Sequence, residues 1–144
     1  MIIAVDFDDK ANIKTIDVPL LGSVPCGTPI LTEENIQAGF PVSIKLARPP
    51  HKYFLLRAKG DSMNKKGIDE GNFILVKQQL TAENGETIVA FVDNEVTIKE
   101  YSASRHTVVL RPRSTNKIHK PIVAMRDFQV QGVVVTVIPN LEEQ

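Results

Sequence analysis

The chain has little cysteine, no tryptophan and no excess of charge of either sign. Cys26 is the only cysteine among 144 residues, so the chain cannot form an internal disulfide framework. Lysine plus arginine and aspartate plus glutamate number 17 each, which gives a net charge of zero. Proteins that bind nucleic acid directly usually carry a basic excess, so we expect no direct DNA binding, although binding through a partner stays open.

Long hydrophobic runs are also missing. No stretch approaches the roughly 20 apolar residues that a membrane-spanning helix requires. The first residues, "MIIAVDFDDKANIK", lack the basic and apolar regions of a signal peptide. A single cysteine fits a reducing compartment. We therefore expect a cytoplasmic protein with no membrane attachment.

Short runs rich in β-branched and aromatic residues predict a mostly β domain from residue 53 onward. Asp93 and Asn94 both tolerate positive φ and predict a two-residue hairpin turn. Gly132 lies inside the last run and predicts a bulge or a bend, and one helical turn is expected at 63–70. The predicted strands are 53–58, 72–77, 86–92, 95–101, 107–112 and 128–138.

The first 50 residues have a different composition, with six of the nine prolines of the chain. The stretch "LTEENIQAG" predicts a short helix or a turn. Without a long regular element, we expect this segment to be an extended, mobile arm that packs on the domain and has no core of its own.

Ser62 is the first candidate for chemistry, in "GDSM" after a predicted strand. Glycine, aspartate and serine also favour ordinary turns, and a serine nucleophile needs a base. The histidines are His51, His106 and His119; neither His51 nor His119 has a clear aspartate near it in the sequence, so a Ser-His-Asp triad is disfavoured. The histidines and Cys26 lack the spacing of a zinc site, so no metal is expected.

Lysine is the other possible base, because Ser-Lys pairs are a known form of nucleophilic catalysis. Lys99 lies within the predicted strand "EVTIKEY", on the face of Glu95, Thr97 and Tyr101. The plain interpretation is a solvated strand face. Catalysis requires instead that Lys99 is partly buried, since burial lowers the pKa of a lysine and favours its neutral form.

Five motifs in this order resemble the self-cleaving LexA/UmuD family: "GDSM", "GIDEG", "NFILV", "VDNEVTIKEY" and "VQGVVVTVIPN". The resemblance runs from about Ile16 to Asn140. It implies a LexA/signal-peptidase-like fold, a mostly β barrel or sandwich, with Ser62 as nucleophile and Lys99 as general base. The backbone N–H groups of Asp61 and Ser62 would form the oxyanion hole. No cofactor is implied.

Members of that family cut their own chain at Ala-Gly or Cys-Gly, which points to Cys26-Gly27 here. The expected organisation is an arm at 1–50 that carries the cleavage site and a peptidase domain at 51–144. Pro25 departs from the pattern and could slow cleavage, because it has no N–H to donate. Asn72 replaces a usual acid, and we expect that change to be structural only.

The resemblance leaves two branches open. Residues 1–26 show no pair of amphipathic helices, so we expect no operator binding by this chain alone. The favoured interpretation is a UmuD-like accessory subunit of a translesion DNA polymerase in the SOS response to DNA damage. The alternatives are the peptidase and dimerisation domain of a LexA-like or phage repressor without its DNA-binding head, or a catalytically silent docking module. The family implies a homodimer and a RecA filament on single-stranded DNA as partners.

Overall fold

The computed structural model describes residues 14–25, 29–124 and 128–139, and it is mostly β, as the sequence predicts. All six predicted strands are present, and the predicted helical turn is the 3₁₀ turn η3 (Asn64–Lys66). A second turn, η2, spans Glu33–Asn35. The strands of the described part are β1 (Thr15–Leu21), β2 (Ile36–Ser43), β3 (Tyr53–Arg57), β4 (Phe73–Gln78), β5 (Thr87–Val92), β6 (Glu95–Ala103), β7 (Val108–Arg111), β8 (Ile122–Ala124) and β9 (Phe128–Ile138).

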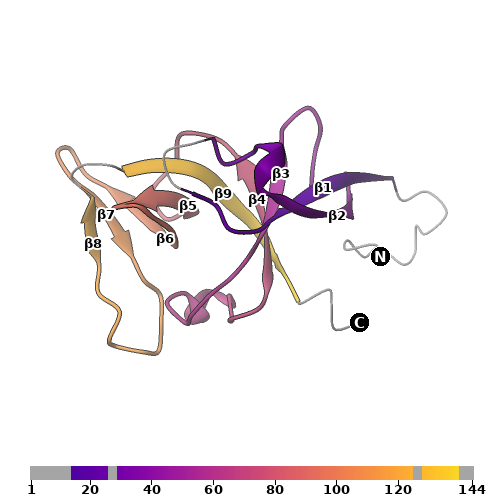
Figure 1. The fold of residues 1–144 in the computed structure, drawn as a ribbon. Helices are drawn as coiled ribbons and strands as arrows, with labels where there is room; N and C mark the ends of the chain where they lie inside the picture. The colour runs from indigo at the N-terminus through magenta and orange to yellow at the C-terminus, as the bar shows by residue number, and fades with distance from the viewer. Residues whose placement is uncertain (1–13, 26–28, 125–127, 140–144) are drawn as a thin grey trace.

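These strands form one open, mixed sheet in the order β2-β1-β3-β4-β9-β5-β6-β7-β8. Figure 1 shows an elongated molecule with β1 and β2 toward one end and β7 and β8 at the other. The long last strand β9 crosses the middle, where it pairs with β4 through its second half and with β5 through its first half. β9 therefore joins the two ends of the sheet.

The central strands are buried on both faces. On β3, Phe54 and Leu56 belong to one apolar cluster, while Leu55 between them belongs to another. Neighbouring residues on β4 divide in the same way, Ile74 into the first cluster and Leu75 into the second. Side chains of a strand alternate between faces, so continuous apolar runs such as "NFILV" give a strand with a core on each side.

Two local predictions are confirmed. Asp93 and Asn94 have φ of 47° and 66° in a two-residue turn that returns β6 against β5. Beside Gly132, Val130 pairs with Ala90 and Gly132 with Val89, so β9 carries one extra residue there. This is the geometry of a β-bulge.

The sequence predicted no long regular element in the first 50 residues, but two strands, β1 and β2, lie there. The two strands pair antiparallel along their length, and β1 meets β3 in parallel at Leu20 and Leu55. Val18 and Leu20 are buried in a cluster shared with β3 and β4, so the premise of a mobile segment fails there. The prolines misled the prediction because an edge strand such as β2 tolerates a proline, here Pro41. The division at residue 50 stays a prediction.

Candidate active site

Ser62 lies in the turn between β3 and η3, which we call the Ser62 turn (residues 58–63). Gly60 has a φ of 74°, a conformation that glycine adopts without strain. Met63, which follows Ser62, is buried in the same apolar cluster as Ile68 and Phe54. The turn is thus held against the core on one side, while Ser62 itself remains partly exposed.

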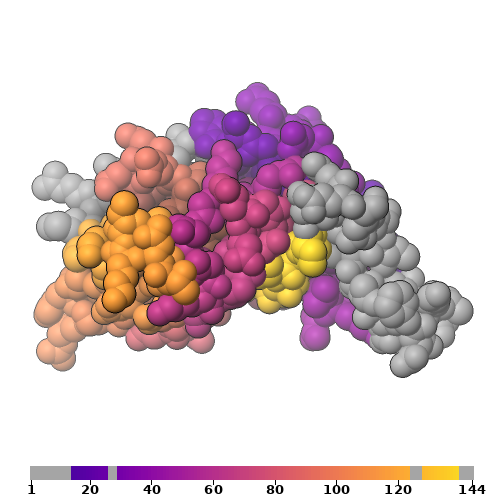
Figure 2. Space-filling model, turned by 90° about the horizontal axis from the view of Figure 1, so that it is seen from below, coloured from indigo at the N-terminus to yellow at the C-terminus, as the bar shows by residue number. Residues whose placement is uncertain are grey.

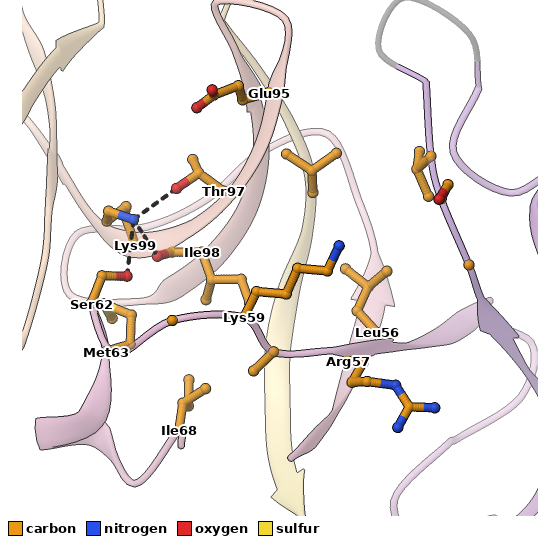
Figure 3. Close-up of a pocket in the computed structure, with 16 residues that line it drawn as sticks. Leu56, Arg57, Lys59, Ser62, Met63, Ile68, Glu95, Thr97, Ile98 and Lys99 are labelled. Carbon is orange, nitrogen blue, oxygen red and sulfur yellow. Dashed lines mark hydrogen bonds between the residues drawn. The ribbon is translucent and has the colours of Figure 1, made fainter. Parts of the chain in front are cut away.

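Lys99 reaches Ser62 from the middle of β6 (Figure 3). Its Nζ lies 3.1 Å from the Oγ of Ser62. The same Nζ donates to the Oγ1 of Thr97 at 2.7 Å and to the carbonyl oxygen of Ile98 at 3.1 Å. Thr97 and Lys99 share one face of β6, as the alternation of the strand predicts. Two oxygen acceptors, the Thr97 hydroxyl and the Ile98 carbonyl, therefore aim the amine at the serine.

Burial lowers the pKa of Lys99 below its ordinary value, and the negative charge of Glu95 opposes this only in part. A lowered pKa increases the fraction of neutral amine near neutral pH. The neutral amine has a lone pair that can accept the hydroxyl proton of Ser62, which reverses the direction of the hydrogen bond. The pair has the geometry and the electrostatics of a nucleophile with its base.

The same two residues line a cavity of about 530 Å³. Its walls come from β3, the Ser62 turn and the first half of β6, with apolar side chains such as Leu56, Val96 and Ile98. Residues 22–24, which follow β1 directly, line it as well. The predicted cleavage pair, Cys26 and Gly27, lies outside the described residues. The chain that leads to this pair is at the cavity.

His119 has an aspartate partner in the fold, which the sequence did not reveal. Its Nε2 lies 2.5 Å from Oδ1 of Asp61, and the Nδ2 of Asn116 donates to Oδ2 of Asp61 at 3.1 Å. These two hydrogen bonds lower the pKa of the Asp61 carboxyl, the bond from His119 most. In the described part of the chain, however, the side-chain partner of the Ser62 Oγ is Lys99. The geometry favours lysine over histidine as the base.

Three further expectations concern Asn72, the oxyanion hole and metal binding. Asn72 accepts a hydrogen bond from the N–H of Asp69 at 2.8 Å, and its carbonyl oxygen accepts from Ala58 at 2.8 Å, which agrees with a structural role. The oxyanion-hole role of the Asp61 and Ser62 amides stays a prediction. Within the described ranges, no group of three or more metal-ligating side chains is placed to hold a metal ion.

Sequence reasoning missed a set of polar residues between β7 and β8 that contact the Ser62 turn. Arg113 and Ser114 bond to the backbone of the turn, and Asn116 and His119 bond to the Asp61 side chain. Ser114, Asn116 and His119 follow Asp61 by 53, 55 and 58 residues. No local pattern marks such a contact, because only the path of the sheet brings the two segments together.

The chain is similar to known peptidase and repressor sequences over most of its length. The family model described as "Peptidase S24-like" matches residues 19–135. LexA repressors of Acetivibrio thermocellus and Desulfitobacterium hafniense are 37% and 40% identical over 134 and 129 residues, each covering 90% of this chain. The LexA repressor of Geobacillus kaustophilus is 37% identical over 130 residues. The chain spans about three fifths of the length of these relatives, 61–62%.

Among the helices of the described part, none has the length and apolar character needed to cross a membrane.

Proposed function

This chain belongs to the peptidase S24-like family, and from that premise we propose that it is a LexA-like serine peptidase that cuts its own chain. The observation that carries the proposal is the contact between the Nζ of Lys99 and the Oγ of Ser62 at 3.1 Å. We propose that the cut falls between Cys26 and Gly27; the family resemblance and the sequence of a small residue followed by glycine support this choice.

In the proposed reaction, the neutral amine of Lys99 takes the hydroxyl proton of Ser62. The Oγ of Ser62 bonds to the carbonyl carbon of Cys26, and the amides of Asp61 and Ser62 stabilise the resulting oxyanion. As the C–N bond breaks, Lys99 returns its proton to the nitrogen of Gly27. A water that gives its proton to Lys99 then hydrolyses the ester, and Ser62 regains its hydrogen.

The anchoring of the β1–β2 connection supports cleavage in this cavity. Asn35, just before β2, is bonded to Gly22, just after β1: its carbonyl oxygen accepts from the N–H of Gly22 at 2.9 Å. This bond holds the two ends of the β1–β2 connection together. The Nδ2 of Asn35 donates to the carbonyl oxygen of Ile30 at 3.0 Å, and Ile30 is buried in the core. A substrate segment tethered at both ends reacts as an intramolecular partner, which saves the entropy cost of association.

Mass spectrometry of the purified chain, before and after incubation at alkaline pH, tests the proposal. The expected products are residues 1–26 and 27–144. Ser62→Ala and Lys99→Ala should each abolish cleavage, and the double variant should be little worse than either, because the two residues act as a unit. Circular dichroism of each variant checks that the fold is kept.

An unchanged mass after long alkaline incubation would support the silent docking module instead. A cut at another bond would contradict the assignment of Cys26 and Gly27. Cleavage that survives Lys99→Ala would contradict lysine as the base. A histidine would then be the candidate base, first of all His119 beside the Ser62 turn.

The relatives' names support the repressor branch of the two that the sequence left open. They are LexA repressors, and the chain matches about three fifths of each. The role of a translesion polymerase subunit stays the second candidate. Copurification of the cleaved chain with a translesion polymerase subunit would favour that candidate, whereas relief of repression on cleavage of the native protein would favour the repressor branch.

A RecA filament on single-stranded DNA is the proposed activator, on the family resemblance alone. The filament would bind the form with the cleavage segment docked in the cavity better than the open form, and so shift the population. It should accelerate cleavage at neutral pH, where we expect the wild-type chain alone to cleave slowly.

A further inference from the structure

Ser62 and Lys99 come from parts of the sheet that are not neighbours. β3, which leads into the Ser62 turn, is separated from β6 by β4, β9 and β5 in the strand order. No strand-to-strand ladder therefore sets the distance between the nucleophile and the amine. A separate contact must hold the turn against β6, and the connection between β7 and β8 (residues 112–121) lies at that place. In Figure 2 this orange segment packs beside the magenta one that contains the Ser62 turn and η3.

The backbone of Arg113 is bonded to the Ser62 turn and to η3. Its N–H donates to the carbonyl oxygen of Ser62 at 2.8 Å, and its own carbonyl oxygen accepts from the N–H of Lys65 at 2.8 Å. The adjacent Ser114 adds a bond from its Oγ to the carbonyl oxygen of Asp61 at 2.6 Å. The peptide units on both sides of the nucleophile are thus held by two consecutive residues.

The side chain of Arg113 is bonded to the strand that carries Lys99. Its Nε donates to Oε2 of Glu100 at 3.0 Å and its Nη2 to Oε1 at 2.6 Å, a two-point contact with defined geometry. Glu100 follows Lys99 directly on β6, and its side chain is only 12% exposed. Lys66 is a second cation at this carboxylate, 3.4 Å from Oε2. Arg113 alone joins both the Ser62 carbonyl and β6 among the described residues.

We propose that Arg113 is a positioning residue for the dyad, whose backbone holds Ser62 and whose ion pair with Glu100 sets the distance from Ser62 to Lys99. The proposal rests on the proposed self-cleavage. Arg113 does not touch the reacting atoms, so its effect is on the fraction of molecules with a productive geometry. A shift of about 1 Å at a reacting pair can cost up to about 100-fold in rate.

The test measures the self-cleavage rate of the full chain against pH, with Arg113→Gln, Glu100→Gln and the charge exchange Glu100→Arg with Arg113→Glu. Each single variant should lower the high-pH rate by about 10-fold or more. The charge exchange should recover most of the loss, incompletely because Lys66 then faces a cation. Arg111→Gln is the matched control, since Arg111 lies opposite Glu100 in the β6–β7 ladder and loses the same charge.

The pH profile and the unfolding temperature separate positioning from other effects. The charged groups that bear on Lys99 include Glu95, while Glu100 faces Arg113 and Lys66. Positioning therefore lowers the plateau rate and leaves the midpoint of the profile unchanged. Rates measured well below the melting temperature of each variant exclude unfolding as the cause.

Three results would overturn the inference. Arg113→Gln and Glu100→Gln could cleave as fast as Arg111→Gln, the charge exchange could bring no recovery, or Glu100→Gln could move the midpoint without lowering the plateau. In each case a cleaving wild type and an inactive Ser62→Ala variant would leave the proposed function standing. A wild type that does not cleave would remove both proposals together.

Discussion

At the residue scale, the decisive feature is a lysine that the surrounding segments of the fold partly shield from water. Lys99 lies on a β6 face that the sequence pattern alone would assign to solvent. In the fold, the cavity wall and the Ser62 turn cover it, and burial lowers its pKa. Its proposed role as a base depends on this partial burial, because a fully solvated lysine is charged at neutral pH.

The first prediction concerns the pH dependence of cleavage. The neutral amine of Lys99 is the reactive form, so the rate should rise with pH and level off above the lowered pKa of Lys99. The midpoint should therefore lie below the ordinary value for a lysine. Lys59→Met is the control, since Lys59 lines the same cavity and should leave the midpoint unchanged. A rate that is constant or falls across the alkaline range would exclude Lys99 as the base.

The second prediction concerns Thr97, whose hydroxyl accepts from Lys99 at 2.7 Å. Thr97→Val keeps the β-branched shape and removes the acceptor. The amine then loses one of the bonds that aim it and that stabilise its charge, so the plateau rate should fall about 10-fold and the midpoint should shift to lower pH. Thr97→Ser should restore both values in the same assay. An unchanged profile for the valine variant would show that Thr97 does not orient the amine.

At the element scale, β9 holds the two ends of the sheet together and needs a glycine to do so. A Cβ on Gly132 would lie 2.5 Å from the carbonyl oxygen of Lys77 and 2.5 Å from a methyl carbon of Val76. Both belong to β4, the neighbouring strand, which cannot retreat without breaking its own pairing. The bulge at this point lets β9 pass from β4 to β5.

The third prediction is that Gly132→Ala lowers the free energy of unfolding by about 1–3 kcal/mol, as overpacking does. Gly39→Ala on β2 is the matched control, because a Cβ there would have no atom within 4 Å. Urea unfolding followed by circular dichroism measures both. Equal stability of the two variants would mean that β9 and β4 can separate slightly at no cost.

At the scale of the whole molecule, the sheet leaves one part of β9 incompletely covered. The segment 133–137 is apolar except for Thr136, and Val135 is 42% exposed. β9 lies between β4 and β5 in the sheet, so a second copy could not pair with it as an added strand. A second copy would instead pack against the side chains of segment 133–137 that are exposed, such as Val135. This is the surface that we expect in the predicted homodimer, whose symmetry would place it against itself.

The fourth prediction tests that surface. The wild type should sediment as a dimer at micromolar concentration, and Val135→Glu should sediment as a monomer, since a charge would then be buried in an apolar interface. Val123→Glu on β8, a site that is 55% exposed, is the control and should remain a dimer. Dimers formed equally by both variants would place the interface elsewhere.

The sequence by itself determined the strands from residue 53 onward, the Asp93-Asn94 turn, the bulge beside Gly132 and the two members of the candidate dyad. These features depend on local rules, namely alternation, turn conformation and short motifs. The prolines hid β1 and β2. Local rules do not say that β2 will lie at the edge of the sheet, nor that β1, which contains Pro19, will pair with β3 only at Leu20.

Only the tertiary structure decided which residues surround the dyad. The contact of Ser62 with Lys99, the pairing of His119 with Asp61 and the bond from the N–H of Arg113 to the carbonyl oxygen of Ser62 all join segments that are distant in sequence. Their positions depend on the order of the strands in the sheet and on the path of the β7–β8 connection. The lowered pKa of Lys99 follows from the same packing, since desolvation depends on every segment that covers a side chain and not on its neighbours in the sequence.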